Sequence, residues 1–243
     1  GYDFIEWAAE QPWCNGKIGA MGQSYLGYTQ WSVAACEHPA LKTLFLEVSG
    51  AEPYDIFWRR GMFRQEVWTP WAFGMMGEHR RQNNQPASKI KKAMNLRPQS
   101  KLGETFIGEE CDFYTKWISN ENPTDPYWSE GYWGNLKEIP AKVKIPVLLQ
   151  GSWFDIFLQP QLKGFRRLPE EVRKQSRFFI GPWTHIGFKT GDVKLPNGGA
   201  GSFLFASQAL EWFEYQLKGK SYPHKLGVVD AYQVNSGEWL EYE

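Results

Sequence analysis

The chain has 243 residues, 16% of them aromatic, and its 27 basic and 27 acidic side chains give a formal net charge of zero. This balance argues against a nucleic-acid-binding protein, which normally carries a basic excess, and no apolar run reaches the roughly 18 residues of a membrane span. Three cysteines without metal-site or disulfide spacing, and no cleavable signal pattern, predict a reducing, cytoplasmic compartment.

Short apolar segments alternate with helical patterns along the chain. Segments rich in β-branched or aromatic residues, and bounded by glycine, proline or polar residues, predict buried strands at 17–21, 41–48, 145–150 and 177–180. Apolar periodicity predicts helices at 1–11, 24–37, 159–168 and 203–217. Because the strands lack polar alternation and are separated by helices, the fold class is α/β, with a parallel sheet covered on both faces.

Two segments depart from this alternation of predicted strands and helices. Residues 55–140 are charged and rich in tryptophan, which predicts a mostly helical cap inserted into the core. After residue 220, the alternation of VVDAYQV predicts the start of a separate β-rich module. The expected organisation is therefore a first half of the core at 1–54, the cap at 55–140, a second half of the core at 141–220, and the new module at 221–243.

The stretch GKIGAMGQSYLG carries a candidate nucleophile, Ser24. A serine between a buried strand and a helix, with a glycine two residues before it, has the arrangement of a nucleophile elbow. The general motif also has a glycine two residues after the serine, where this chain has Leu26, followed by Gly27. The alternative is that Ser24 simply caps the helix that follows.

A nucleophilic serine needs a histidine base and an orienting acid, which in elbow hydrolases follow the serine in the order acid, then histidine. His185 follows the strand at 177–180, and Asp155 follows the strand at 145–150. Both are expected at the carboxyl edge of the sheet with Ser24, where open α/β sheets bind ligands. The other histidines, His38, His79 and His224, lie at a helix end, in the cap and in a late loop.

Two further sets of residues have alternative interpretations. Glu47 and Asp55 follow the second strand and are substitutes for Asp155 as the acid. Aromatic residues flank the acid and the base and are candidates for the wall of an apolar substrate pocket, with core packing as the alternative for each: Trp153, Phe154, Phe157 and Trp183.

Several sequence blocks together resemble the Xaa-Pro dipeptidyl-peptidase-like serine hydrolases, the CocE/NonD group that includes cocaine esterase and α-amino-acid ester hydrolases. These blocks are GYDFIEWAAEQPWCNGKIGAMGQSYLG, NPTDPYW, IPVLLQGSWFDIF and GPWTHIG, in the order found in that family. The family has the pattern G-x-S-Y-x-G, which Leu26 and Gly27 fit. The closing VVDAYQVNSGEWL resembles the first strand of a β-sandwich.

The resemblance implies an α/β-hydrolase core with a helical cap and a carboxy-terminal jelly roll. It implies that Ser24 is the nucleophile, Asp155 the acid and His185 the base, and that Tyr25 supplies a backbone N–H to the oxyanion hole. In that family a tyrosine side chain and the first strands of the sheet precede the nucleophile segment. We therefore expect this chain to represent a part of a longer protein.

The function expected is hydrolysis of an ester or amide through an acyl-enzyme, with no metal or organic cofactor. The first alternative is an Xaa-Pro dipeptidyl-peptidase, which would bind a free amino terminus through carboxylates such as Glu47, Glu52, Asp55 or Glu66. Another class is an inactive interaction module or a carbohydrate-binding module that uses the tryptophans. The expected partner is a small ester, amide or short peptide, not nucleic acid or membrane, and a homo-oligomer is left open.

Overall fold

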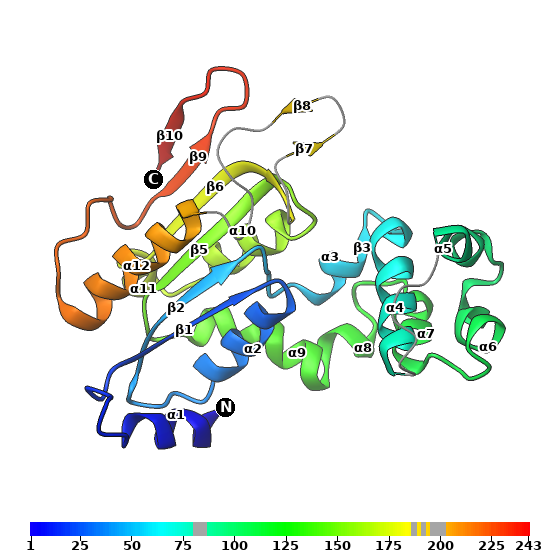
Figure 1. Cartoon of the computed structure of the whole chain (residues 1–243), viewed down its shortest axis with the longest axis horizontal. Helices are drawn as coiled ribbons and strands as arrows, with labels where there is room; N and C mark the ends of the chain where they lie inside the picture. The colour runs from blue at the N-terminus through cyan, green and yellow to red at the C-terminus, as the bar shows by residue number, and fades with distance from the viewer. Residues whose placement is uncertain (80–86, 186–188, 191–192, 195–202) are drawn as a thin grey trace. The chain divides into compact units, whose positions relative to one another are not determined.

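The computed structural model describes all residues except 80–86, 186–188, 191–192 and 195–202 (Figure 1). It contains two compact units, one formed by Gly1–Glu52 with Asn135–Glu243 and one formed by Pro53–Gly134. The second unit falls within the segment predicted as an insertion, apart from its first two residues.

The first unit is built on a six-stranded sheet with the strand order β1-β2-β5-β6-β9-β10. Its strands are β1 (Ile18–Gln23), β2 (Leu41–Glu47), β5 (Val147–Phe154), β6 (Arg177–Thr184), β9 (Val229–Tyr232) and β10 (Trp239–Tyr242). The strands from β1 to β9 pair in parallel, and β10 runs antiparallel to β9. The predicted α/β class with a mostly parallel sheet is confirmed.

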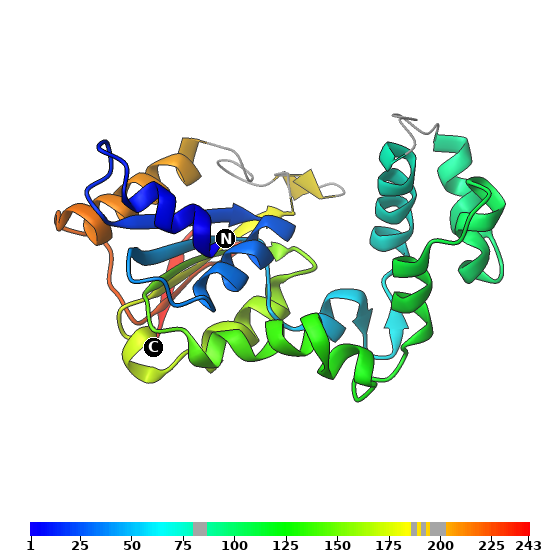
Figure 2. The same cartoon turned by 90° about the horizontal axis from the view of Figure 1, so that it is seen from below.

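Helices cover both faces of this sheet. Figure 2 shows α12 (Phe203–Lys218) on one side and α10 (Leu158–Arg167) on the other. The helix α2 (Tyr25–Ala34) packs against β1 and β2, and the remaining helices of the unit are α1 (Tyr2–Ala9), the 3-10 helix Ile139–Lys142 and α11 (Glu170–Arg173). The central strands β2, β5 and β6 are buried along nearly their whole length, which explains their continuous apolar sequences.

The segment predicted to begin a separate β module instead continues the central sheet. Phe178 of β6 pairs with Val229 of β9, and Ile180 pairs with Ala231. The alternating sequence arises because β9 lies near the edge of the sheet and is only partly buried. The paired strands β9 and β10 thus extend the central sheet, and a separate module beginning within residues 221–243 stays a prediction.

The second unit is mostly helical. Its elements are α3 (Pro53–Phe57), β3 (Trp58–Arg59), β4 (Met62–Phe63), α4 (Gln65–His79), α5 (Ala87–Asn95), the 3-10 helix Gln99–Lys101, α6 (Leu102–Phe106), α7 (Asp112–Ser119), α8 (Pro126–Ser129) and α9 (Gly131–Glu138), which runs on into the first unit.

The first unit also contains a two-stranded antiparallel sheet of β7 (Lys189–Thr190) and β8 (Val193–Lys194). None of the helices in the described part of the chain is both long and apolar enough to cross a bilayer.

Four buried tryptophans belong to the core of the second unit: Trp58, Trp68, Trp117 and Trp128. The Phe57 ring centroid lies 4.3 Å from that of Trp117 and 4.7 Å from that of Trp68. The indole N–H of Trp58 donates to the Trp117 carbonyl at 2.9 Å, and that of Trp68 donates to the Ile56 carbonyl at 2.8 Å. The indole donors of these two buried tryptophans are thus satisfied within the unit.

Candidate active site

Ser24 lies at the sharp turn between β1 and α2. Its backbone has φ 58° and ψ −127°, a conformation that costs a residue with a side chain about 1–3 kcal/mol. Its N–H donates to the Glu47 carbonyl at 3.0 Å, which ties the turn to the end of β2. Its hydroxyl makes no capping bond to α2, so the interpretation of Ser24 as a helix cap does not hold.

Two glycines allow this turn, and their contacts explain the spacing of the motif. A Cβ on Gly22 would lie 2.4 Å from the Leu26 carbonyl oxygen, and a Cβ on Gly27 would lie 2.3 Å from both Cβ and Oγ of Ser49. Leu26, in contrast, is 45% exposed. The close approach of α2 to the end of β2 therefore falls at the third residue after the serine, which is why the glycine stands there.

The hydroxyl of Ser24 faces the His185 imidazole. The distance from Ser24 Oγ to His185 Nε2 is 2.9 Å, and the distance from His185 Nδ1 to Asp155 Oδ2 is 2.8 Å. A carboxylate acceptor at Nδ1 requires the proton on that nitrogen, so the neutral imidazole presents a lone pair at Nε2 to the serine hydroxyl. This is the hydrogen-bond order of a Ser-His-Asp triad.

The ends of two adjacent strands bring the acid and the base together. β5 and β6 pair in parallel with an irregularity between Ser152 and Phe154, and Phe154 lies opposite Thr184. Asp155 and His185 are the next residue after each strand. The Asp155 side chain is fully buried, and its second oxygen accepts the Phe157 N–H at 2.7 Å, whereas the imidazole is 30% exposed.

Tyr25, expected to contribute a backbone N–H, is the first residue of α2. Its N–H is one of the four amino-terminal groups that have no acceptor within a helix. The helix macrodipole also makes this end of α2 favourable for negative charge. The Tyr25 side chain itself is 60% exposed.

The other histidines have separate partners in the described structure. His38 Nδ1 accepts the Ala40 N–H at 3.1 Å, and His224 Nε2 lies 3.1 Å from Glu211 Oε2. The backbone of His79 belongs to α4, and its side chain lies outside the described residues.

The His185 Nδ1 partner is Asp155 and not the alternative acids Glu47 or Asp55, which with Glu52 and Glu66 are also the carboxylates considered for binding an amino terminus. Glu47 is buried at the end of β2, and burial raises the pKa of its carboxyl to about 7. Glu52 is also buried and forms an ion pair with Arg167. Asp55 and Glu66 belong to the second unit.

The four aromatic candidates for a pocket wall differ in burial. Trp153 is 41% exposed, with its indole N–H bound to the Tyr232 carbonyl, and Phe154 is 42% exposed. Trp183 is only 1% exposed and belongs to a core cluster with Phe179 and Trp212. Phe157 is 2% exposed, with its ring against the imidazole. Trp183 and Phe157 are thus almost fully buried, and a contact of any of the four side chains with substrate stays a prediction.

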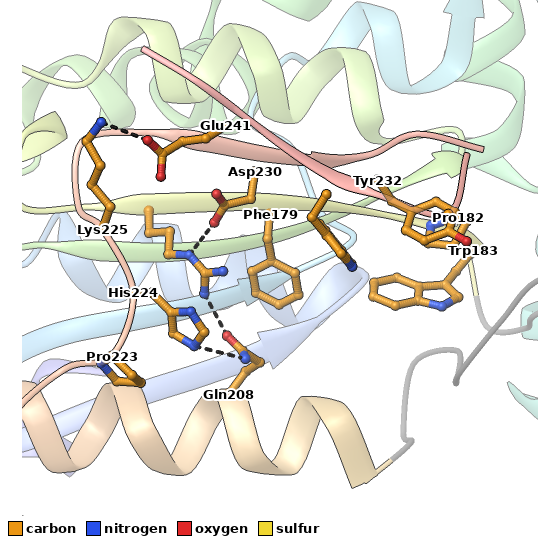
Figure 3. Close-up of a pocket in the computed structure, with 13 residues that line it drawn as sticks. Phe179, Pro182, Trp183, Gln208, Pro223, His224, Lys225, Asp230, Tyr232 and Glu241 are labelled. Carbon is orange, nitrogen blue, oxygen red and sulfur yellow. Dashed lines mark hydrogen bonds and ion pairs between the residues drawn. The ribbon is translucent and has the colours of Figure 1, made fainter. Parts of the chain in front are cut away.

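A cavity of about 680 Å³ lies apart from the triad residues, beside β6, β9 and β10 (Figure 3). Its aromatic lining includes Phe179, Trp183 and Trp239. Its charged groups bind one another: Arg177 Nε lies 2.5 Å from Asp230 Oδ2, and Lys225 pairs with Glu241. None of the triad residues is among the residues that line it.

Among the residues that the structure describes, no group of three or more His, Cys, Asp or Glu side chains has the arrangement of a metal site.

Comparison with known proteins identifies the family of the sequence. The model of the family described as X-Pro dipeptidyl-peptidase (S15 family) matches residues 1–187. A cocaine esterase from Rhodococcus sp. (strain MB1 Bresler) is 23% identical over 199 residues, which cover 75% of this chain and 33% of that protein. The chain thus spans about a third of the length of this curated relative.

Solved structures share the fold over nearly the whole chain. An aminopeptidase from a marine sediment archaeon, Thaumarchaeota archaeon, has a TM-score of 0.75 at 21% identity, covering 99% of this chain and 41% of that one. An α-amino acid ester hydrolase has a TM-score of 0.64 at 20% identity, covering 98% of this chain and 40% of that one. The predicted α/β-hydrolase fold is confirmed by these similarities.

Proposed function

The chain belongs to the X-Pro dipeptidyl-peptidase (S15) family of hydrolases, and we propose that it cleaves ester or amide bonds through a triad of Ser24, His185 and Asp155. The observation that carries this proposal is the continuous hydrogen-bond relay from Ser24 Oγ to His185 Nε2 and from His185 Nδ1 to Asp155 Oδ2. The strained backbone of Ser24 and the absence of a capping bond support it independently.

The first half of the reaction forms an acyl-enzyme. His185 Nε2 accepts the hydroxyl proton as Ser24 Oγ attacks the substrate carbonyl carbon, and the carbonyl electron pair moves onto oxygen. The Tyr25 N–H at the start of α2 donates to this oxyanion. The tetrahedral intermediate then collapses, and His185 delivers the proton to the departing alcohol or amine.

The second half releases the acid. A water molecule gives a proton to His185 Nε2 and attacks the acyl carbon, and the Ser24 oxygen leaves with that proton. Throughout, the buried Asp155 carboxylate keeps the proton of the imidazole on Nδ1 and stabilises the imidazolium that forms in each half.

We propose an ester as the substrate class, in preference to a peptide with a free amino terminus. Of the carboxylates considered for binding an ammonium group, Glu47 and Glu52 are 7% and 8% exposed, and Glu52 is already paired with Arg167. Phe154, 42% exposed and next to Asp155, offers an apolar contact for an acyl group. Comparing turnover of a p-nitrophenyl ester with turnover of an Xaa-Pro p-nitroanilide separates the two classes.

Intact-mass spectrometry after a fluorophosphonate probe tests the mechanism. We expect a single adduct on Ser24 that is absent from Ser24→Ala and still present in Ser32→Ala, a helix α2 serine whose hydroxyl binds the Tyr28 carbonyl. No adduct on the folded protein would contradict the proposal and favour a non-catalytic interaction module.

A further inference from the structure

Gln150 carries a buried acceptor that lacks a donor. Its side chain is fully buried in the middle of β5, and its Nε2 donates to the Gly151 carbonyl at 2.8 Å and to Ser152 Oγ at 3.0 Å. Because a carbonyl can only accept, the contact with Gly151 fixes which end of the amide is the nitrogen. The other end, Gln150 Oε1, has no hydrogen-bond partner in the described structure. An unpaired buried oxygen is costly, so we expect a donor to face it.

The neighbours of Gln150 offer one donor for this oxygen. In a parallel sheet, paired residues point to the same face from strands about 4.8 Å apart. Gln150 pairs with Phe179 of β6 on one side and with Glu47 of β2 on the other. On the same face of β5, Leu148 is apolar and the Ser152 hydroxyl lies at the Nε2 end of the amide. The remaining donor is the carboxyl of Glu47 in its protonated form.

The surroundings of Glu47 favour that protonated form. Glu47 is 7% exposed, and no charged residue occurs in the neighbouring elements β1, α2 and β5. The acidic residues of α12, which covers this face, have partners elsewhere: Glu211 contacts His224, and Glu214 contacts Lys218. Burial alone therefore raises the pKa of the Glu47 carboxyl to about 7.

The end of β2 also anchors the nucleophile turn. β2 lies between β5 and β1, the strand that leads into Ser24 (Figure 1). The Ser24 N–H donates to the Glu47 carbonyl at 3.0 Å, and the Val48 N–H donates to the Gln150 carbonyl at 2.8 Å. Val48 has φ 39°, a left-handed conformation that a β-branched residue rarely adopts. Because such a strained conformation persists only where its surroundings hold it, the contacts between β2 and β5 support the Ser24 turn.

We propose that Glu47 is a positioning residue whose carboxylic acid donates a hydrogen bond to Gln150 Oε1 and so holds the end of β2 on which the Ser24 turn rests. When the carboxyl releases its proton to solvent, a negative charge faces the amide oxygen and the two groups repel each other. The nucleophile then loses its fixed position at alkaline pH. The effect on catalysis rests on the proposed function, whereas the hydrogen bond itself does not.

Glu47→Gln tests this proposal, because glutamine keeps a donor for Gln150 Oε1 at every pH. Dividing kcat of the wild type by kcat of Glu47→Gln removes the effect of every other titrating group, since both proteins share those groups. The two kcat values should be equal at pH 5.5. Because a misplacement of about 1 Å at a reacting group costs up to about 100-fold in rate, we expect the ratio to fall about 10-fold by pH 8.5, with its midpoint at about pH 7.

Two further variants separate positioning from general stability. Glu47→Leu fills the site without a donor, so its kcat should lie about 10-fold below that of Glu47→Gln at every pH. Thr43→Val is the matched control, because Thr43 is also buried in β2 and its hydroxyl accepts the Trp212 N–H at 2.7 Å. This control should lower the melting temperature, while its kcat follows that of the wild type from pH 5.5 to pH 8.5.

NMR of the Gln150 side-chain amide gives a readout that does not depend on turnover. Its signals should shift with pH in the wild type, with a midpoint at about pH 7, and stay constant in Glu47→Gln. A kcat ratio that stays constant from pH 5.5 to pH 8.5, together with a Gln150 amide that does not respond to pH, would overturn this inference. A wild-type protein that fluorophosphonate does not label, yet whose Gln150 amide titrates as expected, would contradict the proposed function and support the hydrogen bond.

Discussion

His185 Nε2 lies 2.9 Å from Ser24 Oγ, although 161 positions separate the two residues in the chain. The contact exists because β1 and β6 both end at the same edge of one parallel sheet, with β2 and β5 between them. The next residue after β1 and the next after β6 are thereby brought close enough for proton transfer.

Replacing the proposed base should abolish most of the activity. His185→Gln removes the acceptor for the Ser24 proton, and loss of a triad member in an established serine hydrolase costs about 10⁴- to 10⁶-fold in kcat. His224→Gln is the control, since His224 binds Glu211 and lies outside the triad. Initial rates with a p-nitrophenyl ester measure both, and equal losses in the two variants would argue against the assignment.

The acid is expected to be Asp155 rather than Glu47. In Asp155→Asn the amide no longer enforces the required tautomer, and we expect a loss of about 10⁴-fold in kcat. Glu47→Gln should retain wild-type kcat, because the Nδ1 partner is Asp155. The opposite ranking in steady-state assays would assign the acid to the end of β2.

Glu47 should make stability depend on pH in a defined direction. Its pKa in the folded state is raised to about 7 from an ordinary value of 4.5, so the folded protein binds this proton more tightly than the unfolded chain. The contribution to stability is therefore present below pH 4.5 and is lost as pH rises through 7, amounting to about 3 kcal/mol.

Urea unfolding between pH 5 and pH 8.5 measures this dependence. Glu47→Gln should remove this part of the decline in the free energy of unfolding with pH. At pH 8.5 the variant should be more stable than the wild type. Glu6→Gln, at an exposed position of α1, should follow the wild-type curve. A wild-type curve that rises across this range, unchanged by Glu47→Gln, would contradict the assignment.

The glycine at 27 should be required for close packing rather than for backbone freedom. Gly27→Ala brings Cβ within 2.3 Å of Ser49, and we expect a loss of about 1–3 kcal/mol in the free energy of unfolding. Ser49→Gly in the same protein removes the clashing atoms and should restore much of this loss, which a double-mutant cycle detects.

Gly164→Ala provides the opposite expectation for a helical glycine. A Cβ there would meet only Pro140 Cγ, at an ordinary 3.8 Å, so the gain in helix propensity of up to about 1 kcal/mol should appear as stabilisation. If Gly27→Ala leaves the urea midpoint unchanged or raises it, as Gly164→Ala should, the Ser49 contact does not explain the glycine.

The sequence by itself determined the strands, the helices and the order of the candidate triad. Short apolar segments bounded by glycine or proline can be recognised locally, and parallel strands must end at one edge of their sheet, so Ser24, Asp155 and His185 could be assigned to that edge.

Only the tertiary structure decided which side chains around that edge are buried. Phe157 and Trp183 could not be distinguished from Phe154 by residue type, because burial depends on which elements pack against each position. The same holds for β9: its alternating pattern reports half-burial, and half-burial arises equally at the edge of an existing sheet and in a new one. Ser49 against Gly27 is a contact between distant segments, and only the folded chain brings such segments together.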